Sequence, residues 1–230
     1  MASRTLAIVL LVSAVIATAT ATGPFPNCHG SAKYKVTFKN LLTPENFRGL
    51  IPPTGLVYSP LAGFSHSNRF SFFTIRGFAN RAVEEIAETG VNNRIIRRGR
   101  RARAQGRGVK SVVDAGAPTL PGKSTTVLLN VDCENSFVTV IGMIAPSPDW
   151  IVQINNRNLF DTQRGRFVRH MSGDLIAYDT GVDDGREFTD PSDPSLDIPT
   201  VPAQNIVPLV EDETDRFEGR VVGRYTIQRV

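Results

Sequence analysis

Residues 145–150 read Ala-Pro-Ser-Pro-Asp-Trp, and they stand between two strand-like runs, residues 137–144 and 151–154. Proline donates no backbone hydrogen bond and fixes its own φ, so two prolines are expected to end a β-ladder. The stretch therefore predicts a rigid corner that presents Asp149 and Trp150. Taken alone, it also fits an ordinary strand connection with a core tryptophan.

Short strands are the commonest pattern outward from this corner. Their polar and apolar residues alternate with the period of a half-buried strand, or they are rich in aromatic and β-branched residues. Glu134-Asn135 is the expected hairpin turn between two of them. Strands are expected at residues 32–40, 70–75, 124–131, 137–144, 151–154, 166–170, 174–178 and 219–230.

One short helix is expected over residues 79–89, with Gly90 as its C-cap. Its apolar residues recur at helical spacing and its glutamates face the other way. Residues 92–122 are basic and contain glycine, and we expect them to form a flexible insertion. Many short strands with a single helix predict a mainly β protein, an antiparallel two-sheet sandwich.

The corner resembles the Ser-Pro-Asp-Trp signature of the spondin amino-terminal domain, which is found in F-spondin and mindin-like extracellular matrix proteins. Further motifs follow in the order that this family shows, and the likeness runs from about Cys28 to about Pro202. They are Lys33-Tyr34-Lys-Val-Thr-Phe38, Tyr58-Ser59-Pro60-Leu61-Ala-Gly63, Ser65-His66-Ser67, the helical residues 77–90, and Tyr178-Asp179-Thr180-Gly181-Val182-Asp183-Asp184-Gly185.

The resemblance implies a spondin-type domain over residues 28–230, folded as a β-sandwich similar to C2 domains. It also implies a secreted module of the extracellular matrix or of cell adhesion, with a cell-surface receptor such as an integrin, or a matrix protein, as its partner. No Arg-Gly-Asp sequence occurs in the chain. Thrombospondin repeats are cysteine-rich, so we expect none in a chain with two cysteines.

Residues 1–21 have the pattern of a signal peptide. Arg4 is the charged flank, residues 6–17 are apolar, and small residues at 17–21 suit cleavage. The apolar run is too short for a bilayer, which needs roughly 20 residues, so no membrane span is expected. The chain's formal net charge of +4 is modest, and the distribution of charge is more informative than its sum.

Cys28 and Cys133 form an even pair, as expected in an oxidising compartment. A disulfide between the N-terminus and a central strand is plausible. Mindin-like members, however, carry their second cysteine after the corner, about where Phe160 lies. The pairing could therefore be new, or either thiol could bridge to another chain.

The resemblance also implies a divalent cation site, with calcium as the expected ion. The family places there the Asp of the Pro-Asp-Trp corner, the Asp of the Asp-x-Gly loop and an acidic residue on the preceding strand. These positions correspond to Asp149, Asp179 and Asn130. Calcium takes carbonyl as well as carboxylate oxygens, but asparagine lacks the charge, so a weaker site is expected unless Asp132 compensates. The alternative is that both aspartates serve turn chemistry alone.

A run of basic residues with no acidic residue between them occupies the predicted insertion. Such runs often bind polyanions, here a sulfated glycan, an anionic cell surface or an acidic matrix protein rather than nucleic acid. Alternatives are cleavage at the dibasic pairs 97–98 and 100–101, or a solvated loop without a ligand. The run comprises Arg94, Arg97, Arg98, Arg100, Arg101, Arg103, Arg107 and Lys110.

No catalytic motif is present, and we predict no enzyme and no catalytic residue. His66 is the one tempting base, and it is expected to be a packed residue bonded to a nearby backbone group. Two rival functions remain: a structural matrix component that cross-links anionic glycans or mineral-associated polymers through the arginines, and a metal-dependent hydrolase using Asp149 and Asp179. Self-association would favour the structural role, and saturable one-to-one binding would favour a receptor ligand.

Overall fold

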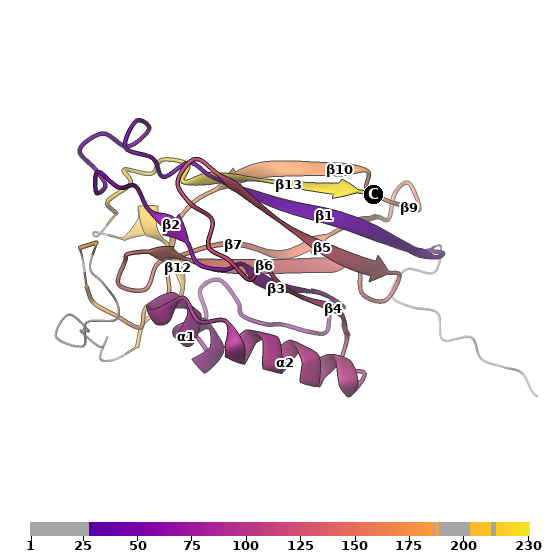
Figure 1. Cartoon of the computed structure of the whole chain (residues 1–230). Coiled ribbons are helices and arrows are strands. Elements are labelled where there is room, and N and C mark those ends of the chain that lie inside the picture. The colour runs from indigo at the N-terminus through magenta and orange to yellow at the C-terminus, as the bar shows by residue number, and fades with distance from the viewer. Residues whose placement is uncertain (1–27, 186, 189–202, 213–214) are drawn as a thin grey trace, which may run out of the picture.

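A computed structural model describes residues 28–185, 187–188, 203–212 and 215–230. These residues form three layers: two antiparallel sheets stacked face to face, and two α-helices against the outer face of one sheet (Figure 1). The prediction of a mainly β antiparallel sandwich is confirmed. The predicted signal peptide at residues 1–21 lies outside the described residues.

The first sheet has the strand order β10-β13-β1-β5 in the described part of the chain. Strand β1 alternates buried and exposed residues along most of its length, so one face packs on the core. It pairs antiparallel with β5 on one side and β13 on the other. The bounds are β10 His170–Leu175, β13 Gly223–Arg229, β1 Ser31–Asn40 and β5 Ser124–Asp132.

The second sheet has the order β12-β11-β7-β6-β3-β4 over the same residues, with β2 also paired to β6. Strand β6 is buried on both faces, since it lies between the inter-sheet core and the helices. The bounds are β12 Val207–Pro208, β11 Tyr178–Asp179, β7 Ile151–Asn158, β6 Phe137–Ala145, β3 Ala62–His66, β4 Val109–Asp114 and β2 Val57–Tyr58. A separate ribbon joins β8 Phe160–Asp161 to β9 Arg166–Phe167, and a short 3-10 helix spans Leu209–Glu211.

Helix α1 spans Arg81–Thr89, close to its predicted place. The Asn80 side chain accepts a hydrogen bond from the Ala82 amide and caps the N-terminus. Gly90 ends the helix in the left-handed region at φ 68°, and its amide donates to the Ile86 carbonyl. The apolar residues predicted to share one face are buried against the second sheet.

The prediction of a flexible insertion at residues 92–122 is wrong, and so is the prediction of a single helix. The segment forms helix α2, Asn93–Ala104, followed by strand β4 on the edge of the second sheet. Helix α2 buries Ile95, Ile96, Gly99 and Ala102, which recur at helical spacing. That buried face, rather than any favourable charge pattern, holds the basic segment in place.

Residues 70–75 form no strand, contrary to prediction, and β3 lies just before them instead. Phe72 and Phe73 are buried between the second sheet and the helices. Their carbonyls accept hydrogen bonds from the side chains of Asn80 and Asn155 rather than from a neighbouring strand. The aromatic residues of this segment therefore line the core. Their composition resembles that of a strand, but the backbone forms no strand pairing.

Cys28 and Cys133 form an intrachain disulfide with 5.5 Å between their Cα atoms, a normal separation for such a bond. Strand β1 already pairs with β5 through Ser31 and Asp132, so the disulfide closes the open end of this ladder. The pairing within one chain, one of the possibilities left open by the sequence, is confirmed.

Helix α2 contacts the second sheet most closely at Gly99. A Cβ atom there would overlap the ring of Phe64 on β3 and lie 3.0 Å from Val112 on β4. We expect Gly99→Val to destabilise the protein by about 1–3 kcal/mol, since overpacking must move a core ring. Ala104→Val, on the exposed side of the same helix, should cost only the difference in helix propensity, below about 0.7 kcal/mol. Equal urea midpoints for the two variants would contradict this packing.

Candidate functional site

The predicted corner is a closed turn between β6 and β7. Ser147 donates its hydroxyl to the Ile144 carbonyl at 2.5 Å and accepts from the Trp150 amide at 3.1 Å. The Ile144 amide donates to the Trp150 carbonyl at 2.8 Å. Ser147, Asp149 and Trp150 are fully buried. The corner is therefore rigid, as predicted, but its aspartate faces the protein interior rather than solvent.

One carboxylate oxygen of Asp149 holds the loop that follows β11. Oδ2 accepts hydrogen bonds from the Thr180 hydroxyl at 2.9 Å, the Val182 amide at 2.9 Å and the Asp183 amide at 3.3 Å. The Thr180 hydroxyl also lies 3.1 Å from the Asp149 carbonyl. Asp149 thus joins the corner to the loop at residues 179–185.

The other carboxylate oxygen of Asp149 has no such role. Oδ1 is buried and finds no hydrogen-bond partner among the residues that the structure describes. A buried polar atom without a partner carries a desolvation penalty that folding does not recover. An oxygen in this state is one that a cation or a proton would satisfy.

Two further buried carboxylates come from the same loop. Asp179 accepts from the Gly181 amide at 2.7 Å, and Asp183 accepts from the Gly185 amide at 2.6 Å. Gly181 has a φ of 71°, and a Cβ there would lie 2.5 Å from the Gln204 carbonyl oxygen. The glycine therefore lets the loop turn back tightly and brings both aspartates in beside the corner.

Burial raises the pKa of Asp149 to about 6, against a usual value of 3.8. The nearby charge of Asp183 also raises this pKa, and the three hydrogen-bond donors on Oδ2 lower it. Burial likewise raises the pKa of Asp179 to about 8, and the charge of Asp149 raises it further. Two carboxylates whose pKa values rise through burial and mutual repulsion favour a shared proton or a bound cation.

At this corner, the Trp150 side chain packs against two aromatic rings. Its ring packs edge-on against Phe188 and Phe217, both at 5.5 Å between centroids. Trp150 is therefore a core residue, as in an ordinary strand connection, and it directly follows the buried Asp149.

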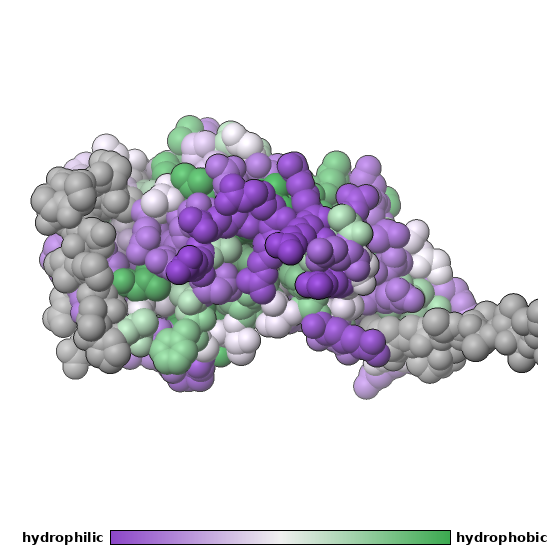
Figure 2. Space-filling model, turned by 90° about the horizontal axis from the view of Figure 1, so that it is seen from below, coloured by the Kyte–Doolittle hydropathy of each residue, from purple (hydrophilic) through white to green (hydrophobic). Residues whose placement is uncertain are grey.

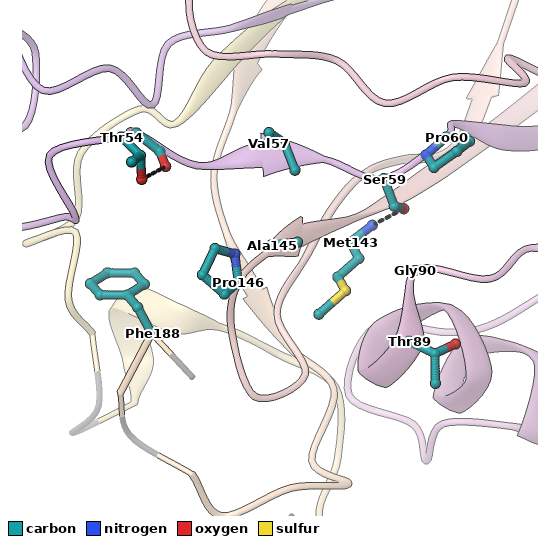
Figure 3. Close-up of a pocket in the computed structure, with 11 residues that line it drawn as sticks. Thr54, Val57, Ser59, Pro60, Thr89, Gly90, Met143, Ala145, Pro146 and Phe188 are labelled. Carbon is teal, nitrogen blue, oxygen red and sulfur yellow. Dashed lines mark hydrogen bonds between the residues drawn. The ribbon is translucent and has the colours of Figure 1, made fainter. Parts of the chain in front are cut away.

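A hollow of about 730 Å³ opens beside the corner. It lies between β2, the end of β6 and the end of α1, and Met143, Pro146 and Phe188 supply apolar surface to it (Figure 3). Figure 3 shows Phe188 facing Pro146 across one end of this space, while Thr89 and Gly90 border the other. An apolar hollow next to buried acids is a feature that the sequence gave no signal for.

Asn130 does not lie with the two aspartates. Its carbonyl accepts from the hydroxyl groups of Ser65 and Ser111, and Ser65 pairs with Val138 near the start of β6. Strand β6 then runs from Val138 to Ala145, about 23 Å at roughly 3.3 Å per residue, before the corner begins. Asp132 lies at the same far end, where it forms a 3.0 Å ion pair with Lys110.

The predicted polyanion-binding residues are concentrated on one helix. Six of them, Arg94, Arg97, Arg98, Arg100, Arg101 and Arg103, belong to α2, Arg107 follows it and Lys110 is on β4. Neither a flexible loop nor an extended cleavage site describes this segment, because both dibasic pairs lie within the helix.

His66 is a packed residue, as predicted. Its Nδ1 lies 2.8 Å from the Ser67 carbonyl and its Nε2 lies 2.9 Å from the Thr139 hydroxyl. Burial lowers the pKa of this imidazole. Both ring nitrogens are thus engaged in the core, and neither faces the aspartates at the other end of β6.

The raised carboxyl pKa values predict an unusual dependence of stability on pH. The native state keeps protons that the unfolded chain has released, so their contribution is complete below pH 4 and is lost as pH rises through about 6 and then about 8. Each unit of pKa difference corresponds to about 1.4 kcal/mol. Without metal, the melting temperature should therefore fall between pH 5 and pH 9, and Asp179→Asn should flatten the profile. A profile that rises in both proteins would contradict the burial of these acids.

None of the described helices is long and apolar enough to cross a membrane.

Comparison with known proteins agrees with the motifs. A family model described as Spondin_N matches residues 32–217. The chain is 28% identical to Spondin-1 of Gallus gallus over 186 residues, which are 78% of this chain and 22% of that protein. It is 29% identical to Spondin-2 of Homo sapiens over 177 residues, which are 74% of this chain and 51% of that protein. The chain thus spans under a quarter of one relative and about half of the other.

Proposed function

The chain belongs to the spondin amino-terminal domain family, and we propose that it is a secreted extracellular matrix and cell-adhesion module that binds calcium at the Asp149 corner. Family membership supports a binding module over an enzyme. The Cys28–Cys133 disulfide supports secretion, because such bonds persist in oxidising compartments.

One observation carries the calcium part of the proposal. Asp149 Oδ1 is fully buried and has no hydrogen-bond partner among the described residues. A second carboxylate, Asp179, lies nearby, and the charge of Asp149 raises its pKa. Calcium prefers such hard oxygen ligands and would neutralise both charges at once. The donor set therefore fits the ion, with Asp149 and Asp179 as the carboxylate ligands.

The site would be modest in affinity. Within the described residues, no three His, Cys, Asp or Glu side chains are gathered as a ready metal cluster. Calcium takes about 6–8 oxygen ligands, so backbone carbonyls and water would supply the remainder. Dissociation constants for extracellular calcium modules are roughly 10⁻⁴–10⁻³ M, and we place this site in that range.

Calcium bound at this corner would order part of the protein surface. Asp149 joins the β6–β7 turn to the loop at residues 179–185, which carries Asp179, and an ion between the two carboxylates would fix that loop against the turn. The apolar hollow beside Pro146 and Phe188 lies at the same edge. We place the contact with a cell-surface receptor or matrix protein there.

The test is adhesion of cells to a surface coated with the mature protein, in calcium and in chelator, beside an Asp149→Asn/Asp179→Asn variant. We expect saturable adhesion that chelator abolishes and that the variant lacks. Adhesion equal in calcium and chelator would overturn the proposal. Gel formation or concentration-dependent self-association without saturable binding would favour the structural matrix role instead.

A further inference from the structure

Helix α2 presents a strongly basic face to solvent. All six of its arginines are exposed, while Ile95, Ile96 and Ala102 are buried on the side that packs against the second sheet. Figure 2, which views the molecule from the helix side, shows a band of hydrophilic side chains across the middle of this face. From Arg94 to Arg103 the arginines extend about 14 Å at roughly 1.5 Å per residue.

Two of these arginines have structural partners. Arg94 forms a 2.9 Å ion pair with Glu85 of α1, and its amide also donates to that carboxylate. Arg98 lies over the ring of Phe72 at 5.1 Å and donates to the Ser71 carbonyl at 3.3 Å. Their side chains help to hold α2 in place against α1 and against the loop that follows β3.

The other arginines of this face have no such task. Within the described part of the chain, the side chains of Arg97, Arg100, Arg101, Arg103 and Arg107 make no hydrogen bond and no ion pair, and we call these five the free arginines. No acidic residue occurs on α2, and arginines three or four positions apart repel one another. The fold thus tolerates a repulsion that a bound anion would relieve.

The side chains exposed on this face limit the classes of partner that can bind there. Protein interfaces depend on a few buried aromatic or aliphatic contacts, and no large apolar side chain is exposed on α2 among the described residues. A membrane-bound amphipathic helix inserts its apolar face, but that of α2 is already buried in the core. Binding of single-stranded nucleic acid uses exposed aromatic rings, and helix α2 contains no aromatic residue.

We propose that the free arginines form a binding site for a sulfated polysaccharide. Guanidinium groups are weakly hydrated and bind oxyanions through paired N–H donors, which suits a dense row of sulfates. Because this site uses α2 and the turn after it, it is separate from the Asp149 corner and needs no calcium.

The test uses heparin as the probe. Binding of the mature protein is measured against sodium chloride concentration and compared with an Arg97→Gln/Arg100→Gln/Arg101→Gln variant. Glutamine keeps good helix propensity, and the replaced side chains are exposed, so the variant should melt like wild type. Counterion release predicts that the slope of log K against log salt falls by about 2 when three contacts are lost.

A matched control removes the same charge elsewhere, in an Arg48→Gln/Arg166→Gln/Arg169→Gln variant whose side chains are also exposed. Its heparin slope should stay within experimental error of wild type, and so should that of Asp149→Asn/Asp179→Asn. Equal losses in both arginine variants would overturn the site, since binding would then follow net charge alone. Tighter binding to phosphatidylserine vesicles or to a DNA duplex than to heparin would overturn the choice of partner.

Discussion

Trp150→Ala is expected to destabilise the protein by about 3–5 kcal/mol, the usual cost of truncating a large buried aromatic residue. The tryptophan is fully buried, and its ring centroid lies 5.5 Å from those of Phe188 and Phe217. The hydrogen bonds of Ser147 fix the backbone of the turn, which limits how far the site can collapse around the cavity. For a domain of this size the melting temperature should fall by about 10 °C.

Trp150→Phe is the matched control for this substitution. It keeps an aromatic ring against Phe217 and leaves a smaller cavity, so the loss should be less than half that of the alanine variant. Thermal melts of the three proteins in chelator isolate packing from any effect of calcium. An alanine variant as stable as the phenylalanine variant would contradict the tight packing at the corner.

Removal of the disulfide, in a Cys28→Ser/Cys133→Ser variant, is expected to cost about 2–5 kcal/mol. The two cysteines are 105 residues apart, so the bond removes much of the conformational freedom of the unfolded chain. The cost stays below the upper end of this range if β1 and β5 remain paired at Ser31 and Asp132 without it.

Urea denaturation measures this loss directly, with wild type in reductant as the control. Reduced wild type and the serine variant should unfold at the same urea concentration, well below oxidised wild type. Coincident curves for all three would mean that the bond contributes nothing to stability. A loss in the variant without one in reductant would point to the serine side chains instead.

Period-two patterns made the sandwich predictable from the sequence. Strands β1, β5 and β13 alternate along their length because one face of each packs on the core, and the sequence records that alternation. Strand β6 was predicted from a continuous run of apolar residues instead, because this strand is buried on both faces. The cap residue Gly90 likewise marked the end of α1, because few other residues adopt that conformation readily.

Helix α2 was missed because its charges obscured a short apolar pattern. Of its buried residues only Ile95 and Ile96 are large, while Gly99 and Ala102 read as loop or neutral residues. Glycine lowers helix propensity, yet here it permits close contact with Phe64, which only the fold reveals. Local sequence therefore described the charge of the segment correctly and its conformation wrongly.

The candidate cation site was predictable only in part. Asp149 and Asp179 stand in motifs that the family resemblance identifies, and the structure places the two loops together. Asn130 was assigned by alignment of strand order, which carries no information on which end of a strand meets the corner. Asp183 was not among the expected ligands, but tertiary contacts between the loop and the corner bury it beside Asp149.

The most direct test is a calorimetric titration of the chelator-stripped mature protein with calcium, beside Asp149→Asn/Asp179→Asn. The account predicts a one-site isotherm with a dissociation constant of roughly 10⁻⁴–10⁻³ M that the variant lacks. Because the pKa of Asp179 is raised to about 8, binding at pH 7 should also release protons, and the measured heat should change with the ionisation enthalpy of the buffer. No heat from wild type up to about 10 mM calcium, an order of magnitude above that range, would contradict the calcium site.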